Sequence, residues 1–304
     1  MKRVLSPTKA LIAILLPGAL IWAACTKNNN NSGGPTSASN TTLMASVDAS
    51  ADASFTDLTN NILSTKVNGQ SYGAVDDSTS SFSQVIAKAF LQQHVTVDGP
   101  DSTNQVSISV SPGTAGVWPE TVTINFGSGF RDLWGNVYTG SISMVFSGPL
   151  INQGASVTTT FSNYSFDSIQ LTGTHILTNT STGDTSLSFS VQIQNAKVTL
   201  PNGFWVNWNA SRNWARIAGG STPLWPFDDV YDVTGNGSGS ASGGFTWTTT
   251  IETPLQRAYV CPWFESGTVK IVTNYGTGVL DYGSGSCDNQ ATVTVGDTTK
   301  NITL

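Results

Sequence analysis

From about residue 94 to residue 304, apolar and polar residues alternate with a period of two. Residues 121–126 (TVTINF) and 185–200 (TSLSFSVQIQNAKVTL) show the pattern most clearly, and Gly, Asn, Asp and Pro separate the alternating segments. Such alternation is typical of strands that bury one face and expose the other. Because no helical segment stands between successive strands, the sheet should be mainly antiparallel.

The alternating segments predict the fold class. Several of them are longer than the five or six residues of a common strand. Long strands in a meander favour a strongly curved sheet. We therefore predict a mainly β protein with a single large antiparallel sheet over residues 94–304, arranged as a curved meander, a half-barrel or an elongated roll.

The period is helical rather than two in an N-terminal portion, residues 43–93. Residues 43–66 place Leu58 and Ile62 four positions apart, and residues 83–93 (SQVIAKAFLQQ) repeat this spacing. We expect one or two short helices here, ahead of the sheet.

Residues 1–24 have the organisation of an export signal. A basic start is followed by 13 apolar residues, 10–22, and then by Ala23 and Ala24. The apolar run is too short for a membrane span, which needs about 20 residues. It predicts a signal peptide that is removed on export.

Cys25 follows the two alanines directly. This arrangement resembles the lipobox of bacterial lipoproteins, in which the cysteine is acylated, with palmitate among its chains, and becomes the mature N-terminus. Trp22 stands where the lipobox prefers Leu, so an ordinary secretory signal cut near Ala24 is the alternative. The resemblance implies a lipid anchor. Thr26, in place of an Asp that would favour inner-membrane retention, implies the outer membrane, at its periplasmic face or the cell surface.

Residues 25–42 contain no large apolar residue after Cys25. We predict a lipidated cysteine followed by a disordered tether, because such a segment buries too little apolar surface to fold.

The charge balance excludes one class of partner. Residues 1–24 carry three of the 13 basic residues and none of the 19 acidic ones, so ten basic side chains remain against 19 acidic ones and the net charge becomes −9. The arginines are few and scattered: Arg131, Arg212, Arg216 and Arg257, with Arg3 in the signal. Nucleic-acid binding requires a basic patch, so no nucleic-acid partner is expected.

Cys261 and Cys287 remain once Cys25 carries lipid. In an exported protein two cysteines are expected to form a disulfide, and two buried free thiols are the alternative.

A tryptophan-rich segment is the candidate ligand site. Residues 204–227 hold Trp205, Trp208 and Trp214 together with Arg212 and several asparagines. Exposed tryptophans stack on sugar rings, while amides bind the hydroxyl groups. The alternative is that these tryptophans belong to the core.

No catalytic or metal motif is present. Glu120, Glu252 and Glu265 are the only glutamates, at spacings that do not indicate a glycosidase pair. The sequence leaves open whether Asp228, Asp229 and Asp232 bind an ion. We predict neither an enzyme nor a cofactor nor a metal site.

These observations favour a lipid-anchored cell-envelope protein with a binding or scaffold role. Its partners would be the membrane, through the anchor, and either a glycan or an apolar ligand. A carbohydrate-binding or polysaccharide-processing surface lipoprotein is the alternative.

Overall fold

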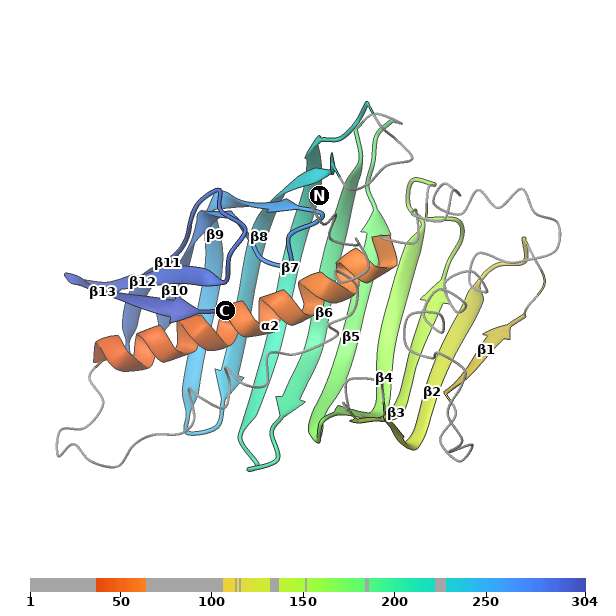
Figure 1. Ribbon diagram of the computed structural model, residues 1–304, viewed down its shortest axis with the longest axis horizontal. Helices are drawn as coiled ribbons and strands as arrows, with labels where there is room; N and C mark the ends of the chain where they lie inside the picture. The colour runs from red at the N-terminus through yellow and green to blue at the C-terminus, as the bar shows by residue number, and fades with distance from the viewer. Residues whose placement is uncertain are drawn as a thin grey trace, which may run out of the picture.

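The described part of the chain consists of one antiparallel sheet with a long helix lying against it (Figure 1). The computed structural model describes residues 37–63, 106–112, 114, 116–131, 137–150, 152–183, 186–221 and 228–304. Within them the mainly β fold and the antiparallel meander are confirmed. The residues of the signal, Cys25 and the second expected helix, 83–93, lie outside the described residues.

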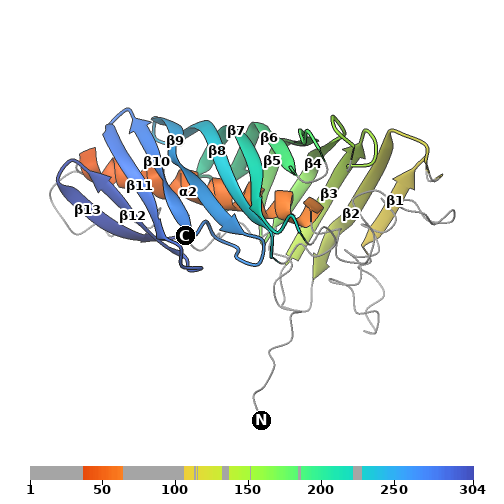
Figure 2. The same cartoon turned by 90° about the horizontal axis from the view of Figure 1, so that it is seen from above.

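The sheet contains thirteen strands in chain order, so each strand pairs with its neighbours in sequence. The sheet is open, and Figure 2 shows its strands following one another from β13 at one end to β1 at the other. The strands are β1 (Ser107–Ser111), β2 (Glu120–Arg131), β3 (Val137–Phe146), β4 (Ser156–Phe166), β5 (Ile169–Asn179), β6 (Ser188–Thr199), β7 (Trp205–Ala218), β8 (Val230–Ala241), β9 (Phe245–Ala258), β10 (Ser266–Thr273), β11 (Gly276–Ser284), β12 (Gln290–Val295) and β13 (Thr298–Thr303).

The pairing register separates two faces. One row of directly paired residues crosses all thirteen strands from Ser111 to Thr299 and is exposed or half-buried throughout. The next row, from Val122 on β2 through His175 on β5 to Gly278 on β11, is buried throughout. We call these the outer face and the covered face. The alternation of polar and apolar residues therefore corresponds to one face that is buried and one that is at least partly exposed, as we expected from the sequence.

Helix α2 (Ser37–Leu63) covers part of the buried face. It has 27 residues, so it is not one of the short helices that we expected. It also begins six residues before residue 43, so residues 37–42, which we assigned to the tether, are helical instead. The segment contains neither Gly nor Pro, which permits an uninterrupted helix.

The hydroxyl groups of α2 explain why so polar a segment folds into the interior. Serines and threonines recur every four residues, and each donates to the carbonyl oxygen one turn earlier, over 2.8–3.2 Å: Thr42 to Ala38, Ser46 to Thr42, Ser50 to Ser46 and Ser54 to Ser50. These bonds satisfy the hydroxyls within the helix itself. Burial therefore leaves no unpaired donor along this stripe.

The helix crosses the sheet from β10–β13 toward β5, as Figure 1 shows. At its start, Thr41 Oγ1 lies 3.2 Å from Thr273 Oγ1 at the end of β10. Near its end, Thr59 contacts His175 on β5. Gly278 allows the close approach to β11, because a Cβ there would lie 3.2 Å from Thr41 Cγ2. Within the described residues, no helix combines the length and the apolar character needed to cross a bilayer.

Candidate functional site

Strand β7 carries all four residues of the predicted ligand site, and its pleat divides them between the two faces. Trp208, Arg212 and Trp214 point to the covered face and are 1–2% exposed. Their aromatic surfaces are therefore core material, and the prediction of an exposed platform is wrong for these three. The physical reason is the period of the strand, since even-numbered residues of β7 share the face on which α2 packs.

Trp205 alone of the four belongs to the outer face. It is half-buried, and Lys197 Nζ on β6 lies 5.7 Å from the centroid of its indole ring. Asn207 follows on the same face, and its Nδ2 is 3.5 Å from Ser240 Oγ on β8. An aromatic ring beside an amide is thus present on the outer face, but as one tryptophan rather than a strip.

The covered face holds a polar cluster that the sequence did not reveal. Asp48 of α2 accepts hydrogen bonds from the indole nitrogens of Trp208 and Trp247, each over 2.8 Å. Burial raises the pKa of the Asp48 carboxyl, and the nearby Arg212 opposes the shift. Two tryptophans on β7 and β9 are thereby fixed to one residue of the helix.

Asp52, one turn further along α2, forms an ion pair with Arg212. Its Oδ2 lies 3.0 Å from Arg212 Nη2, and both side chains are almost fully buried. Arg212 also donates to the carbonyl oxygen of Asn236 on β8, and its guanidinium carbon lies 5.8 Å from the ring centroid of Trp208. Burial alone would lower the pKa of Arg212, but the carboxylates of Asp52 and Asp48 outweigh it and raise the pKa. The guanidinium is therefore charged inside the protein.

His175 joins the end of α2 to β5. Its Nε2 lies 2.9 Å from Thr59 Oγ1, and its ring stacks on Phe55 with the centroids 6.4 Å apart. Burial lowers the pKa of His175 to about 3, so the ring is neutral at pH 7. Its partners on α2 are a hydroxyl group and an aromatic ring. These contacts position the helix on β5.

Little empty space remains between α2 and the sheet. Two small cavities border the helix, one near β4 and β5 and one near the loop after β9, and each has a volume of about 10 Å³. That is room for about one water molecule, whereas small-molecule sites occupy roughly 300–1,000 Å³. Both volumes are far below that range, because α2 packs against this part of the covered face.

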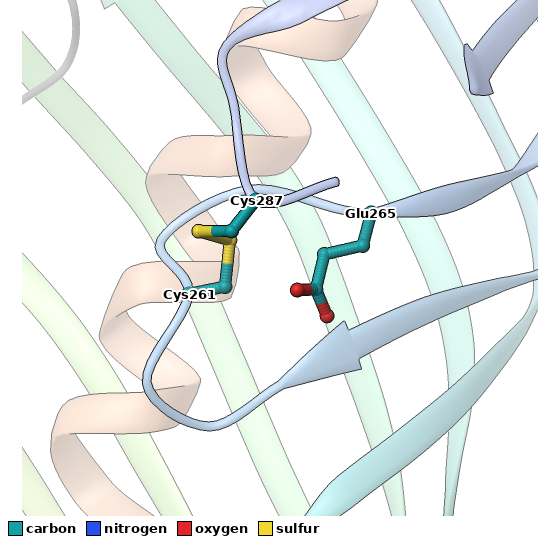
Figure 3. A group of neighbouring side chains, drawn as sticks. All are labelled: Cys261, Glu265 and Cys287. Atoms are coloured by element: carbon teal, nitrogen blue, oxygen red, sulfur yellow. A yellow bond between two sulfur atoms is a disulfide. The ribbon is translucent and has the colours of Figure 1, made fainter. Parts of the chain in front are cut away.

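The expected disulfide between Cys261 and Cys287 is present (Figure 3). It joins the loop after β9 to the loop after β11, with the Cα atoms 5.7 Å apart. Glu265 lies beside it, and its Oε2 accepts a hydrogen bond from the Ala258 amide over 2.8 Å. Because both sulfur atoms are in the disulfide, this group of three side chains does not offer a thiolate to a metal ion.

The three aspartates near residue 230 do not converge. Asp228 is exposed, whereas Asp229 is buried, with its Oδ1 3.3 Å from Arg216 Nη1. The other oxygen of Asp229 accepts a hydrogen bond from the Tyr231 hydroxyl over 3.2 Å. Asp229 thus has a cationic partner already, and Asp232 lies further along on β8.

The three glutamates are also dispersed. Glu120 is buried on β2, Glu252 is exposed on β9, and Glu265 lies beside the disulfide. Seven strand spacings separate β2 from β9, or about 34 Å along the sheet. Glycoside hydrolysis requires two carboxylates about 5–10 Å apart, and Glu120 and Glu252 do not meet this requirement.

Comparison with known protein families, with curated proteins and with solved structures finds no match to this chain.

Proposed function

We propose that this chain is a lipid-anchored protein of a bacterial cell envelope whose sheet serves as a binding or scaffold surface. Cys25 would be the acylated N-terminus, and the outer membrane would be its location. The observation that carries the proposal is the Cys261–Cys287 disulfide, because such bonds form and persist in oxidising compartments outside the cytoplasm. The position of Cys25, directly after the expected export signal, agrees with the proposed lipid anchor.

The proposed role does not depend on catalysis. Four buried polar residues hold α2 against the sheet through contacts between the helix and the strands: Asp48, Asp52, Arg212 and His175. What the molecule offers to a partner is its outer face, which carries mainly hydroxyl and amide side chains. This favours recognition or scaffolding over a reaction in a cleft.

Replacement of Cys25 by Ser tests the proposal. We expect the native chain in the membrane fraction and Cys25→Ser in the soluble fraction, since stable anchoring of such a protein needs about two acyl chains. A control variant, Thr26→Ser, should stay with the membrane. A Cys25→Ser protein that still sediments with membranes, or a native protein that does not, would contradict the proposal.

Carbohydrate binding, or polysaccharide processing at the surface, is the second candidate. Trp205 favours it, because this ring lies on the outer face beside Asn207. Titration with soluble peptidoglycan fragments and plant glycans should change tryptophan fluorescence in the native protein but not in Trp205→Ala. A spectrum that no glycan changes would remove this candidate.

A further inference from the structure

Two aromatic side chains, the exposed Tyr275 and the half-buried Phe245, form a corner at the end of the sheet where α2 begins. Tyr275 occupies the turn between β10 and β11, and Phe245 is the first residue of β9. Their ring centroids are 5.3 Å apart, and Tyr275 is 36% exposed. We call this pair the aromatic corner.

Asn274 fixes the aromatic corner. Its side-chain amide donates to the carbonyl oxygen of Gly244 over 3.0 Å, and its Oδ1 accepts from the Thr246 amide over 3.2 Å. The turn after β8 and the turn after β10 are thus tied together. The two rings are presented on a rigid support, not on independent loops.

The start of α2 lies at the same place. The hydroxyl of Ser37 donates to the carbonyl oxygen of Tyr275, and Thr41 contacts Thr273. Gly276 permits this approach, because a Cβ there would lie 3.3 Å from Ser37 Oγ. The chain therefore enters the described structure directly beside the aromatic corner.

The chain length between Cys25 and Ser37 limits where a lipid anchor can lie. Only the 11 residues 26–36 separate them, which span at most about 43 Å even when fully extended. The other edge of the sheet, β1, is ten strand spacings from β11, or about 48 Å along the sheet. An anchor on Cys25 therefore does not reach the bilayer when the sheet stands upright with its β1 end on the membrane, and it favours an orientation with the β10–β13 end closer to the bilayer.

We propose that the aromatic corner contacts the headgroup region of the bilayer and sets the orientation of the anchored protein, with the β1 end directed away. This inference rests on the proposed lipid anchor. Tyrosine is suited to such a position, because its ring enters the apolar boundary while its hydroxyl stays with water and headgroups. Val272, 43% exposed and near the end of β10, adds apolar surface beside the turn.

Two exposed valines provide a matched test. Val272 lies near the corner, whereas Val145, 37% exposed, lies on β3, seven strand spacings from β10. Val272→Cys and Val145→Cys would each be labelled with an environment-sensitive maleimide dye in the full lipidated protein. Cys25 is then acylated and Cys261 and Cys287 are joined, so only the introduced thiol reacts.

The labelled proteins would be placed in vesicles of phosphatidylethanolamine and phosphatidylglycerol that contain a spin-labelled lipid. We expect loss of dye emission at residue 272 and none at residue 145, and adding Tyr275→Ser should restore emission at residue 272. Vesicle-bound protein with no loss at residue 272, or equal loss at both sites, overturns the orientation alone. Protein that does not float with the vesicles overturns the lipid anchor and the orientation together.

Discussion

Arg212 and Asp52 carry opposite charges and are buried away from solvent. Their nitrogen and oxygen lie 3.0 Å apart, and neither side chain reaches solvent appreciably. A buried pair of this kind adds little net stability compared with apolar residues, but removing one partner leaves an uncompensated charge. The pair therefore acts mainly to define how α2 sits on β7.

Asp52→Ala should lower the free energy of unfolding by about 3–5 kcal/mol, because Arg212 would stay buried without its ion-pair partner. Urea unfolding followed by circular dichroism measures the change. Asp297→Asn, at an exposed position in the turn before β13, is the control and should change the free energy by less than about 0.5 kcal/mol. Equal stability of Asp52→Ala and the native protein would show that the ion pair does not hold the helix.

His175 makes the stability depend on pH. Its pKa is about 3 in the folded protein and 6.5 in the unfolded chain, so between these values the unfolded chain binds the extra proton. The contribution of His175 to the free energy of unfolding is thus fully present above about pH 6.5, and it is lost as the pH falls toward 3. From pH 7 to pH 4.5 the loss from this residue should be about 2–3 kcal/mol.

The contribution of His175 is obtained by difference. His175→Gln keeps a hydrogen-bonding group but does not titrate, so unfolding by urea at both pH values should show the smaller loss in this variant. Parallel pH dependence of the two proteins would mean that His175 is not buried in its neutral form.

At the scale of elements, the strands could be predicted from the sequence and the helix only in part. The alternation of polar and apolar residues predicted the β segments, because successive side chains of a strand point to opposite faces of the sheet and only one face is buried. The same pleat places Trp205 and Asn207 on the face opposite to Trp208. The first turns of α2 could not be predicted, because a segment without large apolar residues is expected to be disordered, whereas the hydroxyls of Thr42 and Ser46 bond within the helix.

The buried cluster could not be predicted because it depends on contacts between distant elements. Asp48 and Asp52 are four residues apart, a spacing that places them on one face of a helix. Nothing in the sequence indicates that their partners are Trp247 on β9 and Arg212 on β7. The disulfide could be predicted because only two cysteines remained to pair.

Substitution of Gly239 on β8 tests how closely Trp247 of β9 packs against this strand. A Cβ at this position would overlap the indole ring of Trp247, which donates to Asp48. Gly239→Ala should therefore cost about 1–3 kcal/mol of unfolding free energy through overpacking.

The control for this substitution is Gly148→Ala, where nothing lies within 4 Å of the added carbon. Thermal unfolding of both variants gives the comparison. A midpoint for Gly239→Ala equal to that of Gly148→Ala would contradict the close packing of Trp247 on β8.

At the scale of the whole molecule, thirteen strands form one continuous sheet whose outer face carries mainly uncharged polar groups. Helix α2 covers part of the buried face, and the disulfide joins two loops at the β9–β12 end. The proposed anchor would enter at this end, through residue 37. A surface held at one end of the sheet and free at the other agrees with the proposed binding or scaffold role.

The intact mass of the protein extracted from its native membrane tests the central claim most directly. We expect a chain that begins at Cys25, carries the added mass of its acyl chains and is two hydrogens lighter than the reduced form because of the Cys261–Cys287 bond. A mass that corresponds to a chain beginning at Met1, or to a mature chain without lipid, would contradict the account.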